Sequence, residues 1–275
     1  MPPFPLSRHF RTALVTGAGS GIGGAIAAML AAEGVAVFGT ARRPETLPVR
    51  DRVSLVRFDL ADGPAGAAEL VARVERESGG LDLVVHNAGY GVFGGLLDRP
   101  LDGWRRQIDD MLGTSVALNR AALAAMLPRR SGTLVNITSM AVEFPIPFMA
   151  GYNVVKAGLA ALTESLMLEF PAAGIRIIDF RPGDYRTGFN SSMFTTPFDQ
   201  LSAGQQQVAR RLDATLAAAP RPERAARDLR RALRRGRSGV VRSGSFFQTV
   251  LAPLGVRLMP LAWRRAAMAR YFGVR

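Results

Sequence analysis

The chain has 275 residues with a net charge of +13, and 48% of its residues are hydrophobic, so it can bury a substantial core. It has no cysteine, which excludes disulfides and thiolate chemistry, and its two histidines, His9 and His86, argue against a histidine metal site. Residues 220–275 carry 14 arginines against two acids, so a near-neutral body ends in a basic tail. We see no secretory signal and no apolar run of about 18 residues, so we expect no membrane span and a cytoplasmic location.

The chain opens with a predicted strand (12–16), a glycine-rich turn and a small-residue helix that ends at Gly34. Glycines at such a turn let the backbone approach a pyrophosphate, which then lies at the N-terminus of the helix. An ordinary glycine turn is the alternative, but the position between a strand and a helix favours a dinucleotide loop. The expected cofactor contacts here are Gly17, Ser20, Gly21, Ile22 and Gly23.

The second predicted strand (35–40) is followed by Ala41, Arg42 and Arg43. An acid at the end of this strand would hold the adenosine ribose 2′-hydroxyl, whereas arginine accommodates a 2′-phosphate. Because Ala41 takes the place of the acid, the sequence favours NADP(H) over NAD(H), although Arg43 could also be a solvated helix-cap residue. The third predicted strand leaves Asp59 at its edge, where it could hydrogen-bond an adenine amino group.

The fourth predicted strand (81–89) is nearly all apolar, as strands buried in parallel sheets are. It ends in Asn87, Ala88 and Gly89, which we expect to line the cofactor cleft. We interpret His86 as a packed or cofactor-lining histidine rather than a catalytic one, because no carboxylate is spaced to orient it.

Ser139, Tyr152 and Lys156 give the strongest catalytic signal. Ser139 ends the fifth predicted strand (131–139), and Tyr152 and Lys156 lie one turn apart on a helix that runs to about Phe170. A neighbouring ammonium favours the phenolate, so we expect Lys156 to lower the tyrosine pKa from about 10, while Ser139 could hold a carbonyl oxygen. Tyr-x-x-x-Lys also occurs by chance on helices, but Lys156 is the only lysine in the chain.

The rest of the chain continues the alternation of strands and helices without hairpin signals, which indicates a doubly wound parallel sheet. In such sheets ligands bind beyond the carboxyl ends of the strands, where the predicted site residues gather. Residues 184–200 are irregular, as in a lid or binding segment. The remaining predicted elements are strands at 174–183 and 239–244 and helices at 201–218 and 222–235.

From about Thr12 to Gly244 the chain resembles the short-chain dehydrogenase/reductase family. The resemblance implies one α/β domain at 1–245, with a Rossmann-like, doubly wound parallel sheet of about seven strands and helices on both faces. Residues 246–275 would form a helical extension packed on or next to this domain, and the family suggests a homodimer or homotetramer through the long helices. The resemblance is carried by Thr16-Gly17-x-x-x-Gly21-Ile22-Gly23, Asp59, Asn87-Ala88-Gly89, Ser139, Tyr152-x-x-x-Lys156, and Pro182-Gly183 with Thr187.

The resemblance also implies a role for each site residue. Tyr152 would be the general acid/base, Ser139 would hold the substrate oxygen, and Lys156 would bind the nicotinamide ribose. Thr187 would contact the nicotinamide amide beside the Pro182-Gly183 turn. A hydride would pass between the nicotinamide and a carbonyl or carbinol carbon.

One position departs from the family pattern. Many members carry an asparagine on the long fourth helix, here predicted over 102–127, that completes a proton relay through water to the lysine. In our register this position is Met111, and Asn119 lies two turns later. A methionine side chain cannot order that water, so we expect a main-chain kink or another side chain to do so, or a slower proton exchange.

Apolar side chains are predicted around the reactive centre, whereas sugars and small acids need polar partners. We therefore expect a hydrophobic ketone, aldehyde or alcohol, such as a lipid-, steroid- or retinoid-like substrate. The alternative is that half of these side chains belong to the core. The residues are Phe93, Phe144, Ile146, Phe148, Met149, Phe189, Met193 and Phe194.

The tail, residues 246–275, combines aromatic and leucine side chains with arginines, and Pro253 and Pro260 exclude one continuous helix. It could associate with an anionic membrane or pack over the substrate cleft or a partner subunit, and we favour packing. For the whole protein, the alternative function is a catalytically weak NADP(H)-binding sensor, which would not need Ser139, Tyr152 and the sole lysine together. We expect no nucleic-acid binding, because no aromatic platform or reading motif is present.

Overall fold

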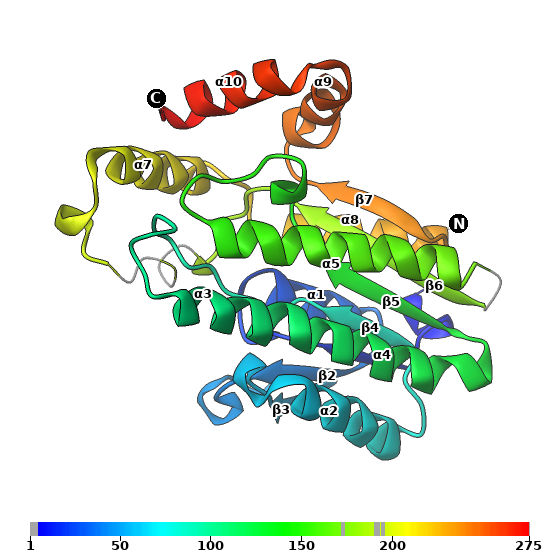
Figure 1. The fold of residues 1–275 in the computed structure, drawn as a ribbon. Coiled ribbons are helices and arrows are strands. Elements are labelled where there is room, and N and C mark those ends of the chain that lie inside the picture. The colour runs from blue at the N-terminus through cyan, green and yellow to red at the C-terminus, as the bar shows by residue number, and fades with distance from the viewer. Residues whose placement is uncertain (1–4, 172–173, 190–192, 194–195, 275) are drawn as a thin grey trace.

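The computed structural model describes residues 5–171, 174–189, 193 and 196–274. Its centre is a seven-stranded parallel sheet in the order β3-β2-β1-β4-β5-β6-β7, with helices on both faces (Figure 1). This confirms the predicted doubly wound α/β fold. The strands are β1 (Thr12–Val15), β2 (Ala36–Ala41), β3 (Val53–Arg57), β4 (Leu83–His86), β5 (Gly132–Ile137), β6 (Ile175–Pro182) and β7 (Gly239–Ser243).

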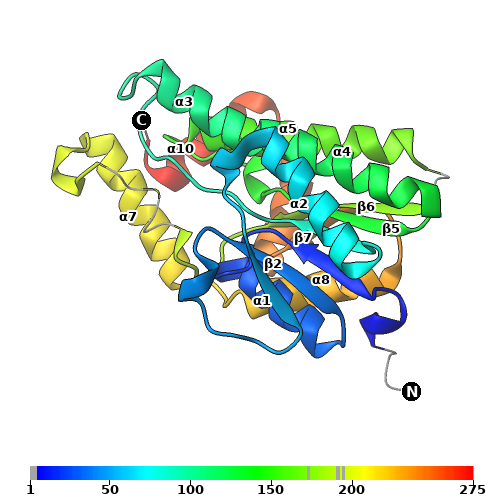
Figure 2. The same ribbon diagram turned by 90° about the horizontal axis from the view of Figure 1, so that it is seen from below.

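Two helical layers enclose the sheet. Helices α1 (Gly21–Ala32) and α8 (Glu223–Arg235) lie on one face, and α2 (Gly63–Ser78), α4 (Thr114–Met126) and α5 (Ala150–Glu169) lie on the other (Figure 2). Every residue of β1, β4 and β5 is buried, because both faces of these central strands are covered. The carboxyl ends of the strands therefore form the edge at which the predicted site residues emerge.

The long helix predicted over 102–127 contains an irregularity whose position the sequence did not predict. Helix α3 (Leu101–Ile108) continues through a π-helical turn (Asp109–Gly113) into α4, and Met111 lies in that turn. Single π turns inside α-helices are rare and occur frequently at functional sites. A main-chain kink is one of the two features that the sequence predicts as a replacement for the missing asparagine, and Met111 lies at such a kink.

The C-terminal helices form a separate layer above β7 and α7 in Figure 1. The helical path breaks at Pro260, whereas it continues through Pro253, which lies just after the π-helical turn at the start of α9. None of the described helices is long and apolar enough to cross a bilayer. This layer consists of a π-helical turn (Phe247–Leu251), α9 (Ala252–Leu258) and α10 (Leu261–Phe272), and α7 beneath it spans Ala203–Ala217.

Short 3₁₀ turns connect many of these elements. They are Leu6–Arg8, Pro44–Thr46, Leu60–Asp62, Leu127–Arg129, Met140–Val142 and Phe198–Gln200.

Candidate active site

The turn between β1 and α1 is a cradle of main chain. Gly17 and Gly21 have φ angles of 69° and 56°, which glycine adopts without strain. A β-carbon at Gly23 would overlap the Gly17 carbonyl oxygen and the side-chain amide of Asn87, so this contact requires glycine. Ser20 is the N-cap of α1, but its side chain makes no capping bond, which leaves the first N–H groups of α1 without a side-chain acceptor.

The end of β4 is tied directly to this loop. The Asn87 side chain donates to Thr16 O at 3.0 Å, and the backbone N–H groups of Asn87 and Ala88 both donate to Thr16 Oγ1 at 2.9 Å. Ile22, the predicted contact on α1, is partly buried against the core beneath β1. These hydrogen bonds therefore hold the glycine loop and the end of β4 together.

A directed chain of hydrogen bonds runs from the glycine loop to the π turn. Because Thr16 Oγ1 already accepts from two N–H groups, we assign its hydroxyl as the donor to His86 Nδ1, which lies 3.3 Å away. His86 Nε2 then carries the ring proton and faces Ser115 Oγ at 2.6 Å, and Ser115 donates to Met111 O. Burial, with a smaller effect from the charge of Lys156, lowers the pKa of His86 to about 3. His86 is thus a packed, neutral histidine.

The three predicted catalytic side chains meet at the end of β5. Ser139 caps a short turn, where its Oγ accepts from Ala141 N at 3.0 Å, and it lies close enough to Tyr152 on α5 to affect the pKa of the phenol. Lys156, one turn along α5, has its Nζ 5.8 Å from the centre of the Tyr152 ring. The same nitrogen donates to Ile137 O, at the end of β5, at 2.7 Å.

The electrostatics of Tyr152 differ from the expectation. Burial raises its pKa above the ordinary value, the hydrogen bond with Ser139 lowers it, and the charge of Asp184 raises it. The net shift is therefore opposite to the expected lowering, because desolvation dominates and the Lys156 ammonium donates to Ile137 O in this structure. Burial lowers the pKa of Lys156 itself to about 8, opposed by the charge of Asp179. At neutral pH the phenol is therefore protonated and the lysine largely charged.

Met111 and the predicted catalytic lysine both approach Gly89. A β-carbon on Gly89 would be 3.0 Å from Met111 Cε and 3.8 Å from Lys156 Nζ. Asn119 instead exchanges two amide hydrogen bonds with Asn136, at 3.1 and 2.7 Å, so its side chain is occupied away from the lysine.

The predicted residues for the adenosine half lie at the ends of β2 and β3. Arg42 and Arg43 are exposed, and among the described residues their guanidinium groups have no hydrogen bond or ion pair. The carboxylate of Asp59 accepts the backbone N–H two residues on and caps the following turn. Thr187 Cγ2 comes within 3.4 Å of where a β-carbon of Gly21 would stand, so the segment after β6 reaches the glycine loop.

Sequence reasoning missed a carboxylate at this cleft. Asp184 follows the Pro182-Gly183 turn, whose Gly183 N donates to Ser243 O at 2.7 Å, and burial raises the pKa of Asp184. Its carboxylate accepts from Gln248 Nε2, on the C-terminal extension. The position beside a predicted cofactor turn could have drawn attention to Asp184, whereas nothing local pointed to Gln248.

A buried ionic network supports the turn that carries Ser139. Glu143, at the end of that turn, pairs with Arg181 at 2.9 Å and with Arg242 at 2.7 Å, and Arg181 also pairs with Asp179 at 2.7 Å. Each of these four side chains is at least three-quarters buried. The network therefore fastens the Ser139 turn to β6 and β7.

An apolar cluster adjoins the phenol, and the Tyr152 ring lies 5.5 Å from that of Phe189. The buried members of this cluster are core residues, in line with the alternative that part of the predicted apolar side chains belongs to the core. Phe144 is partly buried outside the cluster, and Phe194 lies outside the described residues. The buried members predicted from the sequence are Phe93, Met149 and Met193, and the partly buried ones are Ile146, Phe148 and Phe189.

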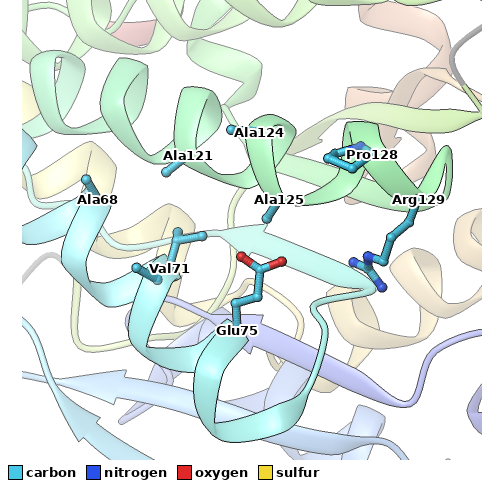
Figure 3. Close-up of a pocket in the computed structure, with 9 residues that line it drawn as sticks. Ala68, Val71, Glu75, Ala121, Ala124, Ala125, Pro128 and Arg129 are labelled. Carbon is cyan, nitrogen blue, oxygen red and sulfur yellow. The ribbon is translucent and has the colours of Figure 1, made fainter.

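The groove drawn in Figure 3 is a different feature. It lies between α2 and α4 and is lined mainly by alanines, with Glu75 and Arg129 as its charged members. It contains no nucleophile and none of the residues at the ends of the strands. The chemistry is therefore assigned to the residues at the carboxyl ends of the strands.

Comparison with known proteins agrees with this geometry. Residues 11–197 match the family model described as short chain dehydrogenase. Dehydrogenase/reductase SDR family member 4 of Bos taurus is 32% identical over 200 residues, which cover 70% of this chain and 72% of that protein. A short-chain dehydrogenase from Streptomyces avermitilis superposes with a TM-score of 0.79 at 27% identity, covering 95% of this chain and 98% of that one. A short chain dehydrogenase/reductase from Burkholderia phymatum in complex with NAD gives a TM-score of 0.78 at 24% identity, covering 94% of each chain. This chain belongs to the short-chain dehydrogenase/reductase family.

Proposed function

We propose that this oxidoreductase uses NADP(H) to interconvert a lipophilic ketone or aldehyde and the corresponding alcohol. The observation that carries the proposal is the meeting of Ser139, Tyr152 and Lys156 at the end of β5, beside an apolar cluster. A sensor that only binds the cofactor would not need this arrangement.

The glycine cradle fits a nicotinamide dinucleotide, because it offers close approach to main chain and the uncapped N-terminus of α1. Bound there, the cofactor supplies or accepts a hydride. Arg42 and Arg43, exposed and without an internal partner among the described residues, favour a 2′-phosphate. The residues that would hold the cofactor are Gly17, Ser20, Gly21, Ile22, Gly23, Arg42, Arg43, Asp59, Asn87, Ala88, Gly89, Tyr152, Lys156, Pro182, Gly183 and Thr187.

Each catalytic side chain then has one task during reduction. The protonated phenol of Tyr152 donates its proton to the substrate oxygen, and the Ser139 hydroxyl holds that oxygen through a hydrogen bond. The Lys156 ammonium stabilises the phenolate that forms. In the oxidation direction the same phenol group takes the proton back.

The shape of the substrate follows from the side chains around Tyr152. The adjoining cluster offers phenylalanine, methionine and isoleucine side chains, which favour an apolar body next to the reacting carbon. The proposal also includes a homodimer or homotetramer through α4 and α5, which expose Val116 and Val154.

The test is NADPH consumption with a panel of ketones and aldehydes, run for the wild type and Tyr152→Phe. We expect Tyr152→Phe to lose at least about 100-fold in kcat while NADPH binding persists, because only the proton transfer is removed. The ratio of NADPH to NADH turnover tests the cofactor preference.

Three results would count against the proposal. An unchanged rate in Tyr152→Phe would remove the assigned acid. Tight NADPH binding without turnover of any carbonyl would favour a sensor. A small polar ketone that outperforms every lipophilic one would exclude the proposed substrate class.

A further inference from the structure

The C-terminal extension carries several large apolar side chains that are exposed. We call this set the tail surface, and its members belong to the π-helical turn, α9 and α10, which form the outer layer in Figure 1. Leu258 is 85% exposed and Trp263 is 70% exposed, although side chains of this kind are usually buried. The tail surface consists of Phe246, Phe247, Leu251, Leu254, Leu258 and Trp263.

Other side chains of the extension hold it to the body, so the tail surface is displayed and not merely unpacked. At one end Gln248 donates to Asp184 and accepts from Ser245 N at 3.3 Å. At the other end Phe272 is buried, and Arg211 of α7 lies 4.5 Å above the Tyr271 ring. These contacts hold both ends of the extension and leave the tail surface exposed.

The charge of the extension indicates what covers this surface. Residues 246–275 contain five arginines and no aspartate, glutamate or lysine. Arg265 and Arg270 are exposed on α10, and Arg264 is partly exposed. A second copy packed on the same face would bring like charges together, which opposes association. An anionic surface with an apolar interior satisfies both the arginines and the exposed aromatic side chains.

The lengths of the helices favour a surface-bound geometry. Helix α9 has 7 residues and α10 has 12, and a helix that crosses a bilayer needs about 20. Tryptophan and phenylalanine side chains are suited to the head-group region, where arginines can meet lipid phosphates.

We propose that the tail surface docks the protein on anionic lipid bilayers, with its apolar side chains inserted at the head-group level and its arginines on lipid phosphates. This goes beyond the proposed oxidoreductase function and does not depend on it. It would place the cleft that contains Asp184 and Gln248 near a membrane, where lipophilic carbonyl compounds are concentrated.

The test is flotation of the full chain with phosphatidylcholine vesicles, with and without phosphatidylglycerol. We expect the wild type to float only with the anionic vesicles and to be released by high salt. Leu258→Ser/Trp263→Ser should reduce vesicle partitioning at least about tenfold, because two inserted apolar side chains are lost. Arg264→Glu/Arg265→Glu should abolish the preference for anionic lipid.

The matched control is Leu97→Ser/Leu168→Ser, which changes two leucines that are 95% and 78% exposed outside the extension and should bind vesicles like the wild type. Circular dichroism and thermal unfolding check that every variant is folded, so a failed docking proposal is distinguishable from a failed enzyme assignment. Absence of flotation at low salt, or equal loss in the control, would overturn the proposal. So would a smaller oligomer in Leu258→Ser/Trp263→Ser by light scattering with vesicle binding intact, because the tail surface would then contact a second copy.

Discussion

His86 shows how burial turns a titratable residue into a fixed connector. Its two ring nitrogens join Thr16, at the glycine loop, to Ser115, which in turn contacts the π turn, and only the neutral ring satisfies both directions. The charge state of His86 therefore affects the stability of the fold and not the catalytic step. The same side chain would look like a catalytic candidate if only its residue type and position were considered.

The pKa of His86 predicts an acid-sensitive fold. Its native pKa of about 3 lies below the ordinary 6.5, so the unfolded chain binds the proton first and stability falls as pH drops from 6.5 towards 3. Between about pH 7 and about pH 5 this residue should cost roughly 2 kcal/mol. Urea unfolding at both pH values should therefore show a smaller loss in His86→Asn than in the wild type. Equal losses would mean that His86 is not buried in the neutral form.

Met111 tests whether the main chain has taken over the role of the missing asparagine. The side chain is 2% exposed and its methyl group faces the Gly89–Lys156 gap, so Met111→Asn should cost about 1–3 kcal/mol of unfolding free energy. Turnover should stay the same or rise, because an amide can order water beside Lys156. Met111→Leu is the control and should change neither property much. A large loss of turnover in folded Met111→Asn would show that the register is wrong.

At the level of elements, the glycine turn depends on contacts that no larger side chain permits. A β-carbon at Gly23 overlaps main chain and Asn87, so Gly23→Ala should shift the start of α1. We expect at least about tenfold weaker NADPH binding and a loss of about 1–3 kcal/mol, measured by fluorescence titration and urea unfolding. Gly103→Ala, on exposed α3 with nothing within 4 Å, should bind NADPH normally and gain up to about 1 kcal/mol. The same effect in both variants would contradict a specific role for Gly23.

For the molecule as a whole, the sequence predicts the features that depend on local patterns and misses those that depend on long-range contacts. The strands, the helices and the convergence of Ser139 with Tyr152 come from local patterns and the parallel topology. The direction of the Tyr152 pKa shift did not follow, because desolvation depends on the packing of distant segments. The hydrogen bond from Gln248 to Asp184 was not predicted either, because the two residues are 64 positions apart in the sequence. Long-range burial and contacts of this kind leave no local signature.

That long-range contact decides how firmly the extension is attached to the catalytic body. Gln248 fills the space against Gly183 and supplies the hydrogen bond to Asp184, so Gln248→Ala removes both the packing and the donor. Such a loss is typically about 1–3 kcal/mol, so local opening of the extension should become roughly tenfold more frequent. Limited trypsin digestion should then cleave at the exposed Arg265 and Arg270 correspondingly faster, while the body persists. Thr249→Ala, which removes only a hydroxyl bond to Ser245 O, is the matched control and should be cut at close to the wild-type rate. Equal cleavage of wild type and Gln248→Ala would mean that α10 alone, through its packing on α7, holds the extension in place.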